Sequence, residues 1–328
     1  MRFMVLLFAL SALPLCFASA HLGHEIMVYQ GACDASGGVA VGKSWFAMAN
    51  DEDNTIRVYP AGRGGEPSWS YDLDHFLEVD DKYPESDLEA GTRLGDLVYW
   101  ISSNGRNRSG KFRESRCRLF AVRLDIADGR VVLEPRGKPY RELIEDFKAD
   151  PRLRALGLAE ASLLRPKARG GLNIEGLCGT PDGRLLLGFR NPLPHRKALL
   201  VPLLNPLPVI LGKERARFGA PVLLHLGGLG IRDIAFVDGE YLILGGPRDG
   251  EGACELFIWK GENQKPERVK RVSFAGLTPE AIIVYPELGS RRVQILSDDG
   301  TKRVNGIDCK KLPPAQRTFR SVWIKLPR

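Results

Sequence analysis

Cysteine and histidine are scarce in this chain of 328 residues, which has six cysteines and five histidines. No two cysteines have Cys-x-x-Cys spacing, so the usual structural zinc patterns are excluded. No two histidines have His-Glu-x-x-His spacing, and no Gly-x-Ser-x-Gly motif is present for a serine nucleophile. These absences exclude the hydrolase classes that are easiest to recognise from sequence.

Long apolar runs are also absent, except at the N-terminus. Residues 3–17 are almost wholly apolar, Arg2 precedes them, and Ala18-Ser19-Ala20 follows them. This pattern predicts a signal peptide over residues 1–20, because the run of about 15 residues is shorter than the roughly 20 that a transmembrane helix needs. A membrane anchor is the alternative. We expect residues 21–328 to be the mature domain, without a membrane span, in the periplasm or secreted.

Cleavage would also remove Cys16 and leave an odd number of cysteines, so at least one must stay free. The five are Cys33, Cys117, Cys178, Cys254 and Cys309. We expect most of them to behave as small buried hydrophobic residues.

The net charge is +7, but the lysines and arginines do not form a single basic cluster in the sequence. Residues 21–100 carry 15 acidic residues against five basic ones, and the remaining basic residues are scattered among the predicted strands. A nucleic-acid-binding surface normally collects its lysines and arginines on one face. We therefore expect no nucleic-acid partner.

In place of long helices, the chain contains a repeated pattern of short strands. Each copy has an acidic residue, small and apolar residues, a turn and a second strand, and the copies begin near residues 34, 87, 173, 231 and 278. Repeats of this size predict an all-β fold, a single β-propeller of about five four-stranded blades. A six-bladed ring and a β-sandwich are the alternatives. The helical spacing near residues 139–160 favours a helical insert over a sixth blade.

The fourth strands are expected at residues 131–137, 222–227 and 272–276, but the last repeat has none of its own. We expect Ile26–Gln30 to supply it by pairing with the strand around Val322–Lys325. Such a split blade closes the ring and leaves no long open edge. We expect the closed ring to be a monomer.

Repeated acids form the first candidate site, because the starts of the innermost strands converge on the central channel. They are Glu89, Glu175, Asp233 and Glu280. Four nearby carboxylates repel one another, so either a cation offsets them or some are protonated. Ca²⁺ suits oxygen ligands, and Asp34, Ser36 and Asn173 could add more oxygens. Alternatively, each acid accepts backbone N–H bonds from the neighbouring blade.

The loops after the second strands should return to the same face. Their candidate ligand-binding residues are Asp51, Asn104, Arg106, Arg190 and Asn191. Asn and Asp are also ordinary turn residues, but a turn does not need Arg190, whose guanidinium suits carboxylate or phosphate. The catalytic candidates are Glu175, Arg190 and His195, with a surface role for His195 as the alternative. The connections 73–88 and 136–172 should cover this face as well.

Four motifs together resemble an exported bacterial family, the domain-of-unknown-function family 3616. They are Asp34-Ala35-Ser36-Gly37, residues 50–54 (Asn-Asp-Glu-Asp-Asn), residues 173–177 (Asn-Ile-Glu-Gly-Leu) and residues 188–192 (Gly-Phe-Arg-Asn-Pro). The resemblance implies a β-propeller without an established activity. More distantly, the Glu-Gly-Leu strand start resembles propeller phytases, esterase-like proteins and calcium-dependent lactonases, which implies a central cation and ester hydrolysis.

The sequence thus predicts an exported propeller that binds a ligand or partner through the face with the repeated acids. We expect the partner to be an anionic small molecule or an extracytoplasmic protein. The alternative is a divalent-cation-dependent phosphoesterase or lactonase-like hydrolase that uses the same face. Whether the protein is an enzyme stays open at this point.

Overall fold

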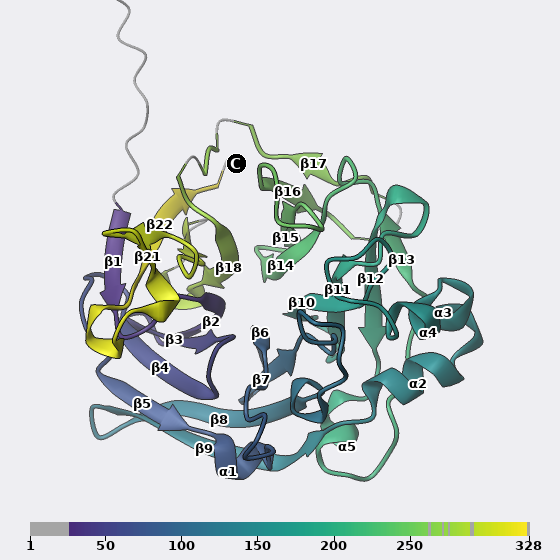
Figure 1. The fold of residues 1–328 in the computed structure, drawn as a ribbon, viewed down its shortest axis with the longest axis horizontal. Coiled ribbons are helices and arrows are strands. Elements are labelled where there is room, and N and C mark those ends of the chain that lie inside the picture. The colour runs from purple at the N-terminus through teal and green to yellow at the C-terminus, as the bar shows by residue number, and fades with distance from the viewer. Residues whose placement is uncertain (1–25, 262–263, 271, 275, 289–291, 327–328) are drawn as a thin grey trace, which may run out of the picture.

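A computed structural model describes residues 26–261, 264–270, 272–274, 276–288 and 292–326. The predicted signal peptide, residues 1–20, lies outside the described residues. Five antiparallel sheets of four strands stand in a ring around a central axis (Figure 1). The predicted five-bladed β-propeller is therefore confirmed, and the six-bladed alternative is wrong.

The first four blades follow the chain from the centre of the ring outward. Blade 1 consists of β2 (Ala35–Val41), β3 (Trp45–Asn50), β4 (Thr55–Pro60) and β5 (Trp69–Asp72). Blade 2 consists of β6 (Leu88–Leu94), β7 (Leu97–Ser102), β8 (Leu119–Ala127) and β9 (Arg130–Tyr140). Blade 3 consists of β10 (Asn173–Gly179), β11 (Leu185–Asn191), β12 (Ala198–Leu203) and β13 (Val222–Leu224). Blade 4 consists of β14 (Gly230–Val237), β15 (Glu240–Gly246), β16 (Glu255–Trp259) and β17 (Glu267–Arg268).

Blade 5 takes strands from both ends of the chain. Its strands are β18 (Pro279–Val284), β19 (Arg292–Ser297), β22 (Thr318–Lys325) and β1 (Ile26–Gln30). The predicted closure by Ile26–Gln30 is confirmed, although its partner segment starts earlier on β22, with Gln30 opposite Thr318 and Ile26 opposite Val322. Figure 1 shows β1 and β22 side by side at the edge of the ring.

The core lies between neighbouring blades, because each blade buries apolar side chains on both faces. Val58 of blade 1 packs in one cluster with Trp100 and Phe120 of blade 2. Near the axis, the inner strands approach so closely that a Cβ at Gly37 would lie 3.0 Å from the Cα of Ala90. The small residues at the strand starts therefore set how tightly the blades pack.

The closing strand is anchored by Tyr29. Its ring is fully buried and lies about 5.1 Å from the rings of Phe46 and Phe319. Its hydroxyl accepts a hydrogen bond of 3.0 Å from Gln294 Nε2. One side chain thus links β1 to both blade 1 and blade 5.

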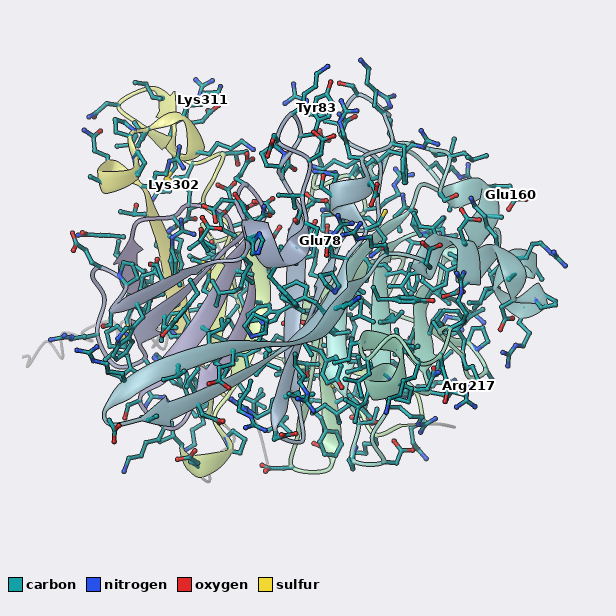
Figure 2. All side chains as sticks on the ribbon, turned by 90° about the horizontal axis from the view of Figure 1, so that it is seen from below. Glu78, Tyr83, Glu160, Arg217, Lys302 and Lys311 are labelled. Carbon is teal, nitrogen blue, oxygen red and sulfur yellow. A yellow bond between two sulfur atoms is a disulfide. The ribbon has the colours of Figure 1, made fainter. Side chains whose placement is uncertain are left out.

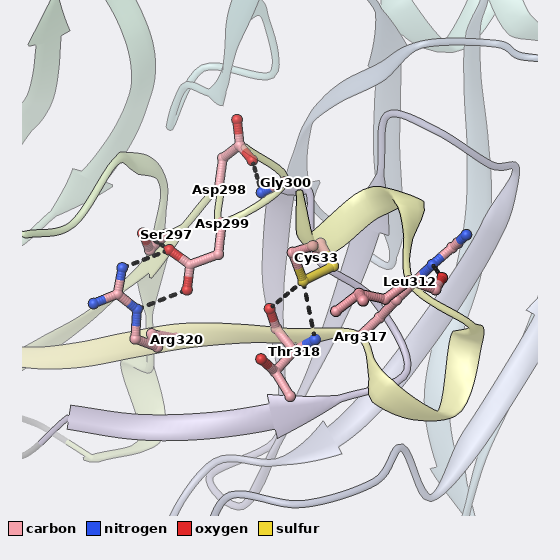
Figure 3. Close-up of a disulfide and its surroundings, with 10 residues drawn as sticks. Cys33, Ser297, Asp298, Asp299, Gly300, Leu312, Arg317, Thr318 and Arg320 are labelled. Carbon is pink, nitrogen blue, oxygen red and sulfur yellow. Dashed lines mark hydrogen bonds and ion pairs between the residues drawn. A yellow bond between two sulfur atoms is a disulfide. The ribbon is translucent and has the colours of Figure 1, made fainter. Parts of the chain in front are cut away.

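A disulfide between Cys33 and Cys309 adds a covalent link at the same junction (Figure 3). The sequence did not reveal this pair, because it joins residues 276 positions apart. Cys117 and Cys178 are free and buried, as expected, and Cys254 is half-buried. Cys309 belongs to an insertion between β19 and β22 that contains β20 (Arg303–Val304), β21 (Ile307–Asp308) and two short 3₁₀ turns, η4 (Cys309–Lys311) and η5 (Pro314–Gln316).

The predicted helical insert is confirmed between blades 2 and 3. It contains α2 (Leu143–Ala149), α3 (Pro151–Ala155) and α4 (Leu158–Ala161). Smaller helical turns are α1 (Asp74–Leu77), α5 (Pro206–Ile210), η1 (Glu114–Arg116), η2 (Pro194–Arg196) and η3 (Pro286–Leu288). One strand was misplaced: the fourth strand of blade 4 is β17 and not the segment 272–276, because Glu267 and Arg268 pair with β16.

Candidate functional site

One large cavity of about 1500 Å³ lies at the axis of the ring, and we call it the funnel. Its centre is formed by Glu89, Glu175, Arg190, Arg232 and Glu280. Both long connections reach it, with Glu85 from 73–88 and with residues 165–168 from 136–172. In Figure 2, Tyr83 of the first connection and Lys311 of the blade 5 insertion stand on the same face of the ring. The funnel is therefore walled by loops from several blades.

The inner strand of every blade has a bulge at one equivalent position. The bulged residues are Ser36, Glu89, Glu175, Arg232 and Glu280. A β-bulge adds an unpaired residue to one strand and redirects its side chain. Four of these five side chains, all but that of Ser36, line the funnel.

Asp233 does not join the three glutamates, which corrects the expected set of four acids. Its carboxylate accepts backbone N–H bonds from Ile234 at 2.8 Å and from Ile282 of blade 5 at 2.7 Å. This is the structural role weighed as an alternative. The bulge shifts the register by one residue, so Arg232 occupies the position assigned to Asp233.

Two buried arginines neutralise the centre of the funnel. Arg232 Nε lies 3.1 Å from Glu175 Oε2, and Arg232 Nη2 contacts Glu280 Oε1. Arg190 Nη1 donates to Glu175 Oε1 at 2.6 Å. Glu175 is thus held by two guanidinium groups and Glu280 by one. Two arginines thus supply positive charge beside Glu175 and Glu280, which reduces the repulsion expected among the acids.

Glu89 is the exception, because its carboxylate has no hydrogen bond or ion pair with a described residue although it is only 8% exposed. Burial raises the pKa of Glu89 well above its ordinary value, and the nearby charges of Asp87 and Glu175 add to the effect. Burial also raises the pKa of Asp87 to about 6, although Arg116 Nη2 lies 2.6 Å from its Oδ1. Burial and like charge thus favour the protonated form of Glu89 and, less strongly, of Asp87.

Arg190 and Lys167 form a second part of the lining, which we call the basic wall. Arg190 is 5% exposed, and its Nε donates to the carbonyl of Pro247 at 3.1 Å. Its Nη2 and the Nζ of Lys167 lie 3.3 Å and 3.8 Å from the point that a Cβ at Gly250 would occupy. Neither nitrogen has a hydrogen bond or ion pair with a described residue. Desolvation, followed by the charges of Arg190 and Arg232, lowers the pKa of Lys167.

Three predicted ligand residues lie outside the lining of the funnel. Asn191 is buried, and its Nδ2 donates to the carbonyls of Pro166 and Ala168, which fixes the loop that carries Lys167. Arg106 donates to the carbonyl of Ser162, and the Nδ2 of Asn104 donates to that of Ser102. Each has backbone partners that account for its position.

Asp51, in contrast, does line the funnel, on the side where blades 5 and 1 meet. Its Oδ1 is buried without a hydrogen-bond partner among the described residues. His195 lies away from the site: it is exposed in η2, has a positive φ of 52°, and is not among the residues that line the funnel. A role for His195 as a base would require it to reach a ligand elsewhere.

The sequence therefore missed Arg232 and Lys167. Arg232 stands beside an acid in a repeat, and only the bulge decides which of the two faces the axis. Lys167 is one of several basic residues in the 136–172 connection, and only the fold brings it next to Arg190.

Comparison with known proteins agrees with the motifs. Residues 133–285 match the family described as protein of unknown function (DUF3616). The resemblance to this family is thereby confirmed for the motifs at 173–177 and 188–192, while those at 34–37 and 50–54 lie outside the DUF3616 match. No curated protein matches this chain.

Solved structures show only distant likeness. Glutaminyl cyclase from Myxococcus xanthus is 12% identical, with 93% of this chain and 96% of that chain covered and a TM-score of 0.47. The PQQ-bound aldose sugar dehydrogenase from Streptomyces coelicolor is 12% identical, with 92% and 99% covered and a TM-score of 0.43. At these values neither likeness bears on the activity of this chain. None of the helices in the described part of the chain is long and apolar enough to cross a membrane.

Proposed function

We propose that this protein is a binding propeller whose funnel holds a small molecule through a carboxylate or phosphate group. The observation that carries this proposal is the convergence of Arg190 Nη2 and Lys167 Nζ over Gly250, where neither has a partner among the described residues. Holding these two positively charged side chains close together costs free energy, and a bound anion would offset that cost.

The other contacts of Arg190 fix the orientation of its guanidinium group. Glu175 and the carbonyl of Pro247 hold Nη1 and Nε, so the free edge of the guanidinium points in a fixed direction. A planar guanidinium that is already oriented loses little freedom when it binds an oxyanion. Lys167, which is exposed at the rim, supplies a second and more adaptable charge.

The acidic wall restricts which anions fit. Glu85, Asp87 and Glu89, which form the acidic wall, line the same cavity. A ligand with negative charge at both ends would meet like charge there. We therefore expect a ligand with one anionic end and hydroxyl or amino groups at the other, which those carboxyl groups can bind.

A second candidate function is hydrolysis, and one observation favours it. The raised pKa of Glu89 favours its protonated carboxyl group, which is the form that general acid catalysis requires. Cleavage of an ester or phosphoester held by Arg190 would then use Glu89 as the proton donor. Turnover in a screen of such substrates would favour this candidate, and binding without turnover would favour the first.

We propose that the protein acts outside the cytoplasm. The Cys33–Cys309 disulfide supports this location, since disulfides persist mainly in oxidising compartments. Every test below should therefore use the mature chain, prepared under oxidising conditions so that the disulfide is present.

The test is a thermal-shift titration at low ionic strength with inorganic phosphate, gluconate and glucuronate. We expect at least one of these anions to raise the melting temperature, and Lys167→Ala to remove most of that rise without changing the fold. Lys213→Ala is the matched control, because Lys213 is exposed and does not line the funnel. Equal responses of the two variants would contradict the proposal.

A further inference from the structure

A second group of carboxylates lies near the junction of blade 5 and blade 1, on segments other than those of Arg190 and Lys167. Asp34 directly precedes β2, while Asp51 and Glu52 follow β3. One carboxylate oxygen from each lies within 4.8 Å of the others. Two oxygens that bind the same Ca²⁺ at about 2.4 Å can be at most about 4.8 Å apart, so the spacing fits one shared ion.

Asp34 is the residue that most clearly indicates a bound ion, because its side chain is buried without a hydrogen-bond or ion-pair partner among the described residues. Only 3% of the residue is exposed, and no described residue donates a hydrogen bond or forms an ion pair with its carboxylate. The space that the carboxylate fills exists because residue 300 is glycine: a Cβ there would overlap Asp34 Oδ1. The structure therefore makes room for a buried, unpaired carboxylate.

Asp51 also has a carboxylate oxygen that lacks a hydrogen-bond partner. Its Oδ1 is buried and has no hydrogen-bond partner among the described residues. Glu52 differs, because Lys310 Nζ lies 2.5 Å from its Oε1. One lysine thus meets one of the three carboxylates. Leaving buried carboxylates unpaired is costly, and a bound cation would remove that cost.

We propose that Asp34, Asp51 and Glu52 bind a divalent cation, with Ca²⁺ preferred. All three ligand atoms are carboxylate oxygens, as hard cations prefer, and no histidine or cysteine takes part. Asp51, Glu52 and neighbouring Asp298 also line the funnel, so water can complete the coordination. This is not the centre of three glutamates, where arginines already supply the positive charge.

The surrounding loops are tied down, as a metal site requires. The disulfide links Cys33, next to Asp34, with Cys309, next to Lys310. Asp299 N donates to the carbonyl of Cys33 at 2.9 Å, and both carboxylate oxygens of Asp299 bind Arg320 at 2.7 Å (Figure 3). All three ligands flank strands of blade 1, and blade 5 reaches the site through the disulfide at Cys309 and through Lys310, which pairs with Glu52.

The test is calorimetric titration of the chelator-treated mature chain with CaCl₂ and with MgCl₂, together with melting curves. We expect one Ca²⁺ per chain, tighter binding of Ca²⁺ than of Mg²⁺, and a higher melting temperature with Ca²⁺. Asp51→Asn should weaken Ca²⁺ binding roughly tenfold or more, because it removes one charged ligand. Asp51 is preferred over Asp34 for this variant, since Asp51 is less buried and its replacement should leave the fold intact.

Asp238→Asn is the matched control. Asp238 is exposed in a turn with a positive φ of 48°, which asparagine tolerates, and it lies outside the cluster. Wild type without a Ca²⁺ response, or Asp51→Asn with the affinity of Asp238→Asn, would overturn the proposal. Neither result touches the anion-binding proposal, because Lys167 and Arg190 belong to other segments.

Discussion

Arg232 of blade 4 occupies the bulge position that Glu175 occupies in blade 3, and Arg232 Nε lies 3.1 Å from Glu175 Oε2. The same guanidinium contacts Glu280 of blade 5. Three successive blades are thus joined at the axis by one buried arginine, which is 4% exposed. Removing this arginine would leave the buried carboxylates of Glu175 and Glu280 with less positive charge to offset their own.

Arg232→Met should therefore be strongly destabilising. We expect a loss of about 3–5 kcal/mol in the free energy of unfolding, as is usual when one member of a buried ion pair is removed. Urea unfolding measures it. Arg248→Met is the control, because Arg248 pairs with Asp249 near the surface and should lose at most about 1 kcal/mol. Similar losses in both variants would show that the Arg232 contacts contribute little.

The same arginine shows how far sequence reasoning reaches. The repeat near residue 231 correctly predicted an inner strand with a polar residue aimed at the axis. It could not decide between Arg232 and Asp233, because a bulge changes which residue faces inward and has no clear sequence signal. Blade number, closure by β1 and the convergence of Arg190 with Glu175 were predictable, since they follow from repeat topology.

Long-range pairings were beyond reach for a different reason. Cys33 and Cys309 are joined across 276 residues, and five mature cysteines allow many connectivities. The approach of Lys167 to Arg190 likewise depends on how the 136–172 insert folds back, where Asn191 holds the carbonyls of Pro166 and Ala168. Such contacts follow from the assembled fold and not from local patterns.

Glu89→Gln should change how stability depends on pH. The pKa of Glu89 is raised in the folded protein, so the native state holds a proton that the unfolded state releases at lower pH. Stability therefore falls as pH rises above the unfolded value of about 4.3, until the folded pKa is reached. Glutamine cannot ionise, so the variant should be the more stable protein at pH 8.

Melting temperatures of wild type and Glu89→Gln between pH 5 and pH 8 measure this difference. We expect the two curves to come together toward pH 5 and to separate by a few degrees at pH 8, about 2–4 °C for each kcal/mol. Parallel curves across the range would mean that Glu89 ionises normally in the folded protein.

Closure of the ring should depend on Tyr29 more than on any exposed residue of β1. Tyr29→Ala removes a fully buried ring between Phe46 and Phe319 and should cost about 3–5 kcal/mol. Tyr29→Phe should cost only about 1 kcal/mol, because Gln294 Nε2 keeps its bond to Ser321 Oγ at 2.8 Å. Val28→Ala, at a residue that is 47% exposed, is the control in the same strand. Chemical denaturation gives all three values, and an equal cost for Tyr29→Ala and Val28→Ala would argue against closure through this ring.

Arg190 should have two separable roles, one structural and one in binding. Arg190→Ala leaves Glu175 with Arg232 and the hydrogen bond from Asn173 Nδ2, so we expect a loss of about 1–3 kcal/mol in stability together with the loss of anion binding. The double variant Arg190→Ala, Glu175→Gln removes the charge left behind and should regain much of that stability, because the two residues are in direct contact. It should not regain anion binding, since the free Nη2 over Gly250 is still missing.

Denaturation and thermal-shift titration of the wild type, both single variants and the double variant complete the cycle. If the double variant recovered anion binding along with stability, Arg190 would act only by holding Glu175, and the funnel would need a different anion-binding group.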